Sequence, residues 1–177
     1  KMNNIVIKTW SKILNQIPKS KLILKHNTFN KSHIRKKIMK LFLQENVKPE
    51  KLIIESGSPR SELFSLYNKI DIALDTFPYN GGTTSFEASL MAVPLLTMIN
   101  ESVMFRCGES FNNNLNMKEW IAENEKDYID KALDFSNNKE KLIQLKKELK
   151  DKVVNNPLFD SKKFADDFYQ MLVKIKK

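Results

Sequence analysis

Two adjacent glycines followed by two threonines form the part of this sequence that is best suited to chemistry. They lie in DTFPYNGGTTSFEASL, residues 75–90, and the whole chain of 177 residues has only four glycines. An apolar run ends at Asp75 and a helical pattern begins near Thr84, so the glycines stand between a strand and a helix. The first amides of a helix lack partners and lie at the positive end of its dipole, and glycine lets an anion approach the backbone closely. Gly82, Thr83 and Thr84 therefore predict a phosphate-binding turn.

A purely structural interpretation of this turn stays open. The turn has neither the dinucleotide GxGxxG pattern nor the lysine of a Walker motif. Thr84 and Glu87 have the spacing of a capping box, in which the acid bonds back to the helix start. As a ligand group, Glu87 would instead accept hydrogen bonds from a diol such as ribose. Asp75 either braces the loop or touches a ligand, and we expect bracing.

A second candidate site lies in SGSPRSEL, residues 56–63. This stretch also follows a strand and opens a helix, so it would lie on the same rim of a parallel sheet. Backbone groups near Ser58 could read the edge of a planar base, and Arg60 could reach a phosphate or a ribose. The alternative is an ordinary loop with a surface arginine.

Short strands alternate with helices through the first hundred residues, which predicts a Rossmann-like parallel sheet covered by helices on both faces. The predicted strands are residues 21–26, 51–56, 71–75 and 93–98. The predicted helices are a first stretch in which Val6, Trp10, Ile13 and Ile17 recur before Pro18, then residues 31–44, residues 61–69 and a helix from about Thr84. The length suits one domain, residues 1–177.

The rest of the chain is predicted to be a helical C-terminal segment, with helices over residues 104–111, 125–135, 138–153 and 161–175. Two apolar stripes run along the last two helices, and we expect both to pack into the core. The stripes are Leu142, Leu145 and Leu149, and Phe164, Phe168, Met171, Leu172 and Ile175.

The composition of the chain limits the binding partners and the cellular compartment that we expect for it. The net charge is +9, but the lysines are scattered among acids and do not alternate with aromatic residues, so we expect no nucleic-acid partner. One cysteine and two histidines offer no disulfide framework and no familiar zinc site. The apolar runs are too short to cross a membrane, and the first residues lack the pattern of a signal peptide. We expect a cytoplasmic protein that has no metal and no membrane partner.

The chain resembles the C-terminal, UDP-sugar-binding half of the O-GlcNAc transferase catalytic region, especially in bacterial and SPINDLY-like members. LDTFPYNGGTTSFEASLMAVPLLTM is similar to the family pattern LD-x-FPYNG-x-TT-x-x-EAL-x-MGVP-V-T. Upstream, KLILK, RKKIMKLFLQENV and SGSPRSELFSLYNKIDIALD follow the family in order and spacing, and so do FRCGESF, WIAENEKDYIDKAL and NNPLFDSKKFADDFYQML downstream. The resemblance thus covers essentially the whole chain.

The resemblance implies the donor-binding C-terminal domain of a GT-B glycosyltransferase, present here as part of a longer protein. In such a domain, Gly82, Thr83 and Thr84 would cradle the diphosphate and Glu87 would contact the ribose. The remaining positions that it implies are Ser58 and Arg60 beside the uracil and ribose, Tyr79 and Asn80 facing the sugar, and Lys1 at the diphosphate. No residue of the chain is a convincing general base, so the catalytic residues stay unknown.

Three departures from the family bear on function. Leu63 stands where many relatives have a histidine near the base, and Ala92 replaces a glycine. The first GT-B domain and the TPR helices, which carry acceptor recognition, are not in this sequence. The resemblance implies an inverting, metal-independent transfer of GlcNAc or a related sugar from UDP to Ser/Thr hydroxyls of an acceptor protein. We expect this chain alone to bind UDP weakly and to transfer no sugar. The alternatives are a non-catalytic UDP-sugar-binding module and a transferase with another donor sugar.

Overall fold

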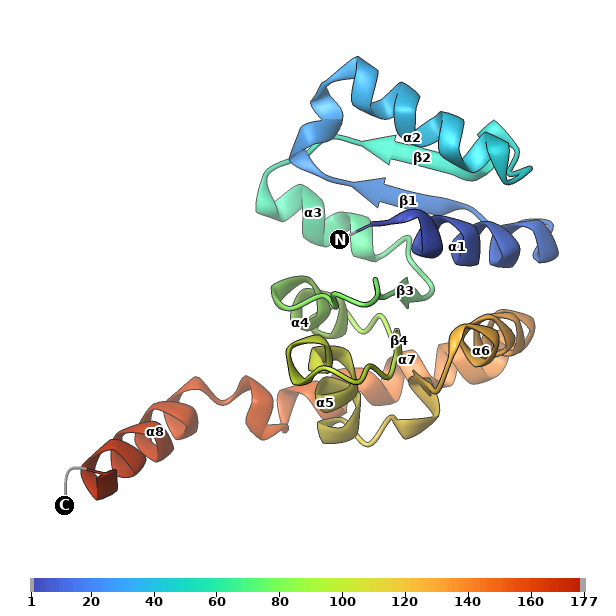
Figure 1. The fold of residues 1–177 in the computed structure, drawn as a ribbon. Helices are drawn as coiled ribbons and strands as arrows, with labels where there is room; N and C mark the ends of the chain where they lie inside the picture. The colour runs from blue at the N-terminus through green and yellow to red at the C-terminus, as the bar shows by residue number, and fades with distance from the viewer. Residues whose placement is uncertain (1, 176–177) are drawn as a thin grey trace.

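The protein is an α/β structure in which short parallel strands are surrounded by helices, and its last helix projects from the body (Figure 1). The computed structural model describes residues 2–175. The α-helices are α1 (Asn4–Gln16), α2 (Ser32–Gln44), α3 (Arg60–Tyr67), α4 (Thr83–Leu90), α5 (Cys107–Asn114), α6 (Glu125–Asn137), α7 (Lys139–Val154) and α8 (Ser161–Ile175). The strands are β1 (Leu22–Lys25), β2 (Leu52–Glu55), β3 (Ala73–Leu74), β4 (Leu95–Met98) and β5 (Ile121–Ala122). Short 3-10 turns connect several of these elements.

All strand pairing among the described residues is parallel, but it falls into two groups. β1 pairs with β2, with Leu22 opposite Leu52, while β3, β4 and β5 form a second group with β4 in the middle. Helices α5 and α6 both pack against β4. The α/β class that the sequence predicts is therefore confirmed, with the parallel sheet divided into two parts.

Helix α1 forms because its apolar side chains repeat at helical spacing and lie on one buried face. Val6, Trp10 and Ile13 are buried, as the sequence pattern predicted, whereas Ile17 is half-buried and caps the end of the helix; Ile7 and Leu14 are buried as well. The Asn3 side chain caps the helix, since its Oδ1 accepts from the Val6 amide at 2.9 Å. The helix packs against both α2 and α6, so it spans the two groups of strands.

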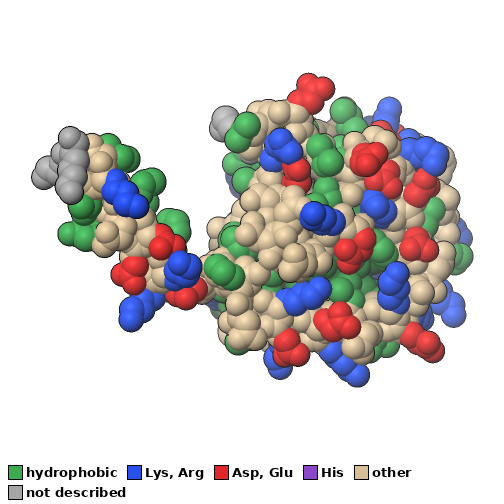
Figure 2. All heavy atoms as spheres, turned by 90° about the horizontal axis from the view of Figure 1, so that it is seen from below, with side chains coloured by type: hydrophobic (Ala, Val, Ile, Leu, Met, Phe, Trp, Pro, Cys, Tyr) green, Lys and Arg blue, Asp and Glu red, His purple; other side chains and the backbone are tan. Residues whose placement is uncertain are grey.

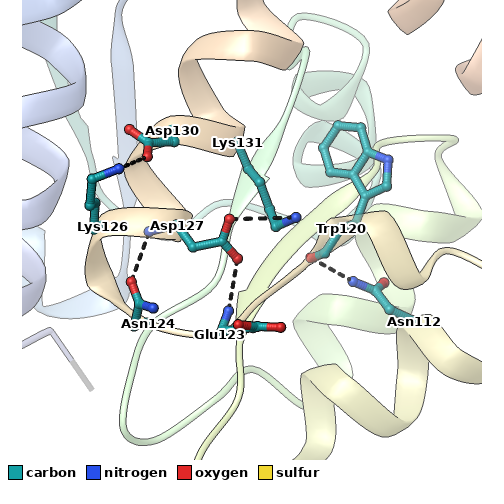
Figure 3. A network of polar contacts seen from close by, with 8 residues as sticks. All are labelled: Asn112, Trp120, Glu123, Asn124, Lys126, Asp127, Asp130 and Lys131. Atoms are coloured by element: carbon teal, nitrogen blue, oxygen red, sulfur yellow. Dashed lines mark hydrogen bonds and ion pairs between the residues drawn. The ribbon is translucent and has the colours of Figure 1, made fainter.

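The start of α6 is fixed by a cluster of polar contacts (Figure 3). Asn124 Oδ1 accepts from the Asp127 amide at 3.0 Å, and Asp127 Oδ2 accepts from the Glu123 amide at 2.9 Å. Asp127 also lies 3.6 Å from Lys131. Beside them, the Asn112 side chain donates to the carbonyl of Trp120 at 3.2 Å and to that of Leu95 at 2.8 Å. These contacts tie α5 to the strand β4 and α6 to the end of β5.

The expectation that both C-terminal stripes enter the core is half wrong. Leu142 and Leu149 of α7 are buried, as expected. In α8 the five stripe residues are all exposed, and no described residue of this helix is buried. Figure 2 shows this helix as an arm that carries apolar side chains away from the body. The stripe lies on an amphipathic helix, as its spacing predicts, but the apolar side chains of this helix are exposed and none of them is buried by residues 2–175.

Surface charges alternate in sign over the face shown in Figure 2, where lysines and arginines stand among aspartates and glutamates. Several charged residues of the protein are paired locally, such as Lys126 with Asp130 and Lys163 with Asp167, both one helical turn apart. This face carries no field of one sign of the kind that nucleic-acid binding uses. None of the helices described here is long and apolar enough to span a bilayer.

Candidate functional site

The loop between β3 and α4, residues 75–82, is held from inside by the carboxylate of Asp75. Asp75 is 4% exposed. Its Oδ1 accepts from the amides of Gly81 at 2.7 Å and Thr76 at 2.9 Å, and its Oδ2 accepts from Thr97 Oγ1 at 2.8 Å. One carboxylate thus joins the beginning of the loop, its end and the neighbouring strand β4. This confirms the expectation that Asp75 braces the loop.

The support of Asp75 comes from elements that follow the loop in sequence. Tyr128 of α6 is fully buried, and its hydroxyl donates to the Asp75 carbonyl at 3.0 Å. Gly108 in the first turn of α5 lies so close that a Cβ there would stand 2.1 Å from Thr97 Oγ1 and 2.5 Å from Asp75 Oδ2. No sequence pattern predicts a role for Thr97, Gly108 or Tyr128 at this loop. Of these three residues, only Gly108 has a signal in the sequence, because the chain contains just four glycines.

The two adjacent glycines differ in their burial and in the space around them. Gly81 is buried, and a Cβ on it would stand 2.5 Å from Ser85 Oγ and 3.0 Å from Thr84 Oγ1. Gly82 is exposed, and a Cβ on it would meet no atom within 4 Å. The first glycine therefore lets the loop close against α4. The second leaves open space directly in front of the helix.

Helix α4 begins at Thr83, with Gly82 as its N-cap. The capping box between Thr84 and Glu87 is therefore wrong, because Thr84 lies one residue inside the helix instead of capping it. No side chain caps this end. Gly82, Thr83 and Thr84 are all exposed, and a Cβ built on Gly82 would meet no atom within 4 Å. Such an end offers donors and a partial positive charge to an anion.

Arg60 and Glu87, which are 27 positions apart, are brought together beside this helix start. Arg60 Nη2 lies 3.6 Å from Glu87 Oε1, and the arginine side chain is mostly exposed whereas Glu87 is buried. The guanidinium also lies 5.3 Å from the centre of the Phe64 ring. The glycine turn before α4 and the loop after β2, which the sequence predicts as two separate candidate sites, therefore lie in one region.

Tyr67 lies next to the same region, and its pKa depends in part on the charge of Glu87. Its hydroxyl is 3.5 Å from the carbonyl of Thr84. Burial of the phenol, and to a smaller extent the negative charge of Glu87, raise the pKa of Tyr67 to about 12.

We expect Glu87→Gln to lower the pKa of Tyr67 from about 12 while leaving it above 10, because burial remains as the larger cause. The neutral phenol is favoured by folding, so its contribution to stability is complete below pH 10 and is lost as the pH rises through about 12. Absorbance at 295 nm against pH measures the titration. Tyr67→Phe identifies which of the four tyrosines is responsible. An unchanged titration in Glu87→Gln would contradict the contact.

A pocket of about 330 Å³ opens beside this region. Its polar lining residues are His26 and Asn27, which follow β1, Ser58, which follows β2, and Thr84 in the first turn of α4. Its remaining wall is largely apolar and comes from β1 and α3. The structure thus brings Ser58 and Thr84 to one cavity, as the rule for parallel sheets predicted.

Tyr79 and Asn80, which the resemblance places toward the sugar, lie differently in the loop. Tyr79 is 48% exposed, and its ring meets that of Phe105 edge to face at 5.8 Å. Asn80 is buried, and its Nδ2 donates to the Thr76 carbonyl at 3.1 Å. The ring of Tyr79 thus lies partly at the surface, whereas the contacts of Asn80 hold the loop. Lys1, expected at the diphosphate, lies outside the described residues.

One histidine of the chain caps a short turn and the other is exposed on a helix. His26 Nδ1 accepts from the Thr28 amide at 3.2 Å and so caps the short turn after β1. His33 is exposed in the first turn of α2. Within residues 2–175, no group of three or more His, Cys, Asp or Glu side chains is arranged to hold a metal ion.

Comparison with known proteins gives one consistent family. Residues 1–168 match the family described as Glycosyl transferase family 41. A tomato (Solanum lycopersicum) protein described as a probable UDP-N-acetylglucosamine–peptide N-acetylglucosaminyltransferase SPINDLY is 29% identical over 161 residues, which are 90% of this chain and 17% of the relative. A Caenorhabditis elegans UDP-N-acetylglucosamine–peptide N-acetylglucosaminyltransferase is 25% identical over 173 residues, 97% of this chain and 15% of the relative.

The fold agrees with the sequence comparison. A solved structure of a mutant O-GlcNAc transferase from Thermobaculum terrenum superposes with a TM-score of 0.88 and 28% identity. The match covers 96% of this chain and 34% of that one, and the chain spans less than a fifth of the two curated relatives. The expected class, the C-terminal half of a GT-B glycosyltransferase, is thereby confirmed. With the family match extending over residues 1–168, this chain belongs to glycosyl transferase family 41.

Proposed function

We propose that this chain is the donor-binding part of an inverting protein O-glycosyltransferase. The reaction would transfer GlcNAc, or a related sugar, from UDP to serine or threonine hydroxyls of an acceptor protein. Support comes from the names of the relatives, which describe UDP-N-acetylglucosamine–peptide transferases, and from the site around Gly82. Acceptor recognition would be supplied by parts of a longer protein.

The observation that carries the proposal is the contrast between the two glycines. The backbone behind the helix start is locked, because the Gly81 amide is bonded to a buried carboxylate at 2.7 Å. The backbone in front is open, because Gly82, Thr83 and Thr84 are exposed and nothing lies within 4 Å of a Cβ built on Gly82. Rigid amides that face open space at the positive end of a helix suit a diphosphate.

The neighbouring residues fit the other parts of a UDP-sugar. In the proposed complex, Arg60 turns from Glu87 to a phosphate or the ribose, and Glu87 accepts hydrogen bonds from the ribose hydroxyls. Ser58 would lie beside the uracil and Tyr79 beside the sugar, with Asn80 holding the loop between them. The chemical task of this part is to orient the donor and to stabilise negative charge on the departing UDP, which the end of α4 and Lys1 would do.

The test compares UDP binding by the parent chain and by Gly82→Ala. We expect the added methyl group to occupy the space of the diphosphate and to weaken binding at least about tenfold, which corresponds to about 1.4 kcal/mol. Because the space at Gly82 is empty, thermal stability should stay nearly unchanged. Isothermal titration calorimetry measures the affinity and circular dichroism the stability.

A control at the far end of the same helix completes this test. Leu90 is 50% exposed in the last turn of α4, so Leu90→Ala should leave UDP affinity unchanged. Equal UDP affinity in Gly82→Ala and the parent chain would overturn the site. So would a folded parent chain that binds no UDP.

A non-catalytic UDP-sugar-binding module is the second candidate, and one observation favours it. Leu63, which stands where many relatives have a histidine, lines the pocket beside Ser58 and cannot donate to a ligand. A transfer assay with UDP-GlcNAc and an acceptor protein, carried out on the full-length gene product, separates the two. Transfer identifies the enzyme, and UDP binding without transfer identifies the module. Transfer only from another UDP-sugar would identify a different donor.

A further inference from the structure

The loops that follow β1 and β2 leave the sheet side by side. The two strands are parallel, with Lys25 opposite Glu55, and the His26 amide continues their pairing by donating to the Glu55 carbonyl at 3.1 Å. In Figure 1 both arrows point the same way, so the chain leaves the two strands at one edge of the sheet. Asn27 and Gly57 each lie two residues beyond these paired ends, and the two loops meet there.

Gly57 leaves the space that the carboxamide of Asn27 occupies. A Cβ on Gly57 would stand 1.7 Å from Asn27 Oδ1 and 2.8 Å from Asn27 Cγ. Gly57 does not have a positive φ that would by itself call for glycine. The absence of a side chain at position 57 therefore serves the Asn27 side chain, which lies directly against this part of the loop.

Asn27 lines the pocket of about 330 Å³ together with Gly57 and Ser58. The residue is exposed, and within residues 2–175 its carboxamide makes no hydrogen bond. The side chains of Asn3 and Asn112, in contrast, are hydrogen-bonded to the protein backbone. The Asn27 carboxamide thus has a close neighbour in Gly57 but lacks the hydrogen-bond partners that a ligand in the pocket would supply.

The turn that carries Asn27 is held on both sides of this residue. Before it, His26 caps the turn, since its Nδ1 accepts from the Thr28 amide at 3.2 Å. After it, the Phe29 amide donates to the His26 carbonyl at 2.9 Å, and the Phe29 side chain is buried. The backbone therefore positions Asn27 before a ligand binds, so that less conformational freedom is lost on binding.

One pocket is lined both by the start of α4 and by Asn27. Thr84 represents the first turn of α4 in this lining, and Ile23, Leu63 and Leu66 supply apolar surface. If the diphosphate of a UDP-sugar lies at the start of α4, as proposed above, its nucleoside enters this pocket. The base would then lie among the apolar side chains with its edge toward Asn27. The inference that follows rests on that proposed function.

We propose that Asn27 selects the base of the donor nucleotide by reading the edge of uracil. In the complex, Asn27 Oδ1 accepts from uracil N3–H, and Asn27 Nδ2 donates to one of the two carbonyl oxygens beside N3. This role comes from the tertiary structure, because Asn27 follows a different strand from Ser58 and Arg60 and meets them only at the edge of the sheet.

A carboxamide and a carboxylate match different bases. The carboxamide presents one acceptor and one donor in a plane, which match the N3–H group and a carbonyl oxygen of uracil. Guanine instead presents two neighbouring donors, N1–H and the N2 amino group, which a carboxylate accepts with its two oxygens. Asn27→Asp should therefore weaken the binding of uracil and favour guanine relative to it.

The test measures the affinities of UDP and GDP for the parent chain and for Asn27→Asp by isothermal titration calorimetry. We expect the parent to bind UDP at least about tenfold more tightly than GDP, and Asn27→Asp to reduce this ratio at least about tenfold, as one bidentate contact to a base does. Because both nucleotides carry the same diphosphate, the ratio cancels its repulsion by the added charge. Asn30→Asp, at the exposed end of the same turn, is the matched control and should leave the ratio unchanged.

Gly57→Ala tests the same contact without changing Asn27. The added methyl group meets the end of the Asn27 side chain, so we expect UDP affinity to fall about tenfold while the midpoint of thermal unfolding stays nearly unchanged. In an Asn27→Ala background the same change should cost no further affinity, because the carboxamide that it displaces is gone. A further loss in that background would show that the methyl group blocks the ligand itself and would contradict the role of Asn27.

The outcomes separate this inference from the proposed function. A parent chain that binds UDP and GDP equally, or an Asn27→Asp chain with the parent's ratio, would overturn the role of Asn27 and leave the donor site at Gly82 intact. A folded parent chain that binds no UDP would overturn both.

Discussion

Asp75→Ala is expected to lower the free energy of unfolding by about 3–5 kcal/mol. The substitution removes the acceptor of the Gly81 amide, of the Thr97 hydroxyl and of the Thr76 amide, at 2.7, 2.8 and 2.9 Å. Each buried donor left without a partner costs about 1–3 kcal/mol. Urea unfolding followed by circular dichroism measures the change in the free energy of unfolding. An unchanged slope of that free energy against urea concentration shows that the variant exposes as much surface on unfolding as the parent does.

Asp75→Asn is the matched control for this prediction. An amide oxygen can still accept from Gly81 and Thr76, and the Thr97 hydroxyl can accept from the amide nitrogen instead of donating. We therefore expect a loss of about 1 kcal/mol, close to the net value of one hydrogen bond. Alanine and asparagine variants of equal stability would show that the hydrogen bonds of this carboxylate do not brace the loop.

Gly108→Ala is expected to lower the free energy of unfolding by about 2–3 kcal/mol, although alanine is the better helix former. A Cβ would stand 2.1 Å from Thr97 Oγ1 and 2.7 Å from Thr97 Cβ, in a side chain that is fully buried. Overpacking of this kind costs about 1–3 kcal/mol and sometimes more, which exceeds the gain of about 1 kcal/mol in helix propensity. The midpoint of thermal unfolding is the simplest measurement.

Gly82→Ala serves as the comparison for Gly108→Ala, because the same methyl group there meets no atom within 4 Å. We expect it to change the free energy of unfolding by less than about 0.5 kcal/mol. The outcome that would contradict the close approach of α5 to Asp75 is a Gly108→Ala protein as stable as the parent.

Local periodicity predicted most of the helices because their burial depends on neighbours in sequence. In α1, Trp10 and Ile13 are buried as their spacing indicated. Residues 104–111 form a 3-10 turn followed by α5, and α5 starts only at Cys107. Strand β5 was not predicted, since two residues carry no periodic signal and Ile121 is a strand only because it pairs with Thr97.

The site was predicted in its parts but not in its assembly. The spacing of strand, glycines and helix pointed to Gly82 and Thr84, and both lie at the open start of α4. The pairing of Arg60 with Glu87 is a tertiary contact at 3.6 Å, and no local rule contains it. The hydrogen bonds of Thr97 in β4 and Tyr128 in α6 to Asp75 are also tertiary contacts, so no local sequence pattern predicts them.

Helix α8 has a thermodynamic consequence for the chain as described. None of its described side chains is buried, so its unfolding exposes little apolar surface that is not already in water. A helix of 15 residues with no buried side chain is marginal in water, since packing supplies most helical stability in proteins. Ser161–Ile175 would therefore fray in its own equilibrium, uncoupled from the cooperative transition of the body. In a thermal unfolding experiment, the ellipticity lost below the temperature of that transition reports the unfolding of α8. The transition itself reports the stability of the sheets and of the hydrogen bonds made by Asp75.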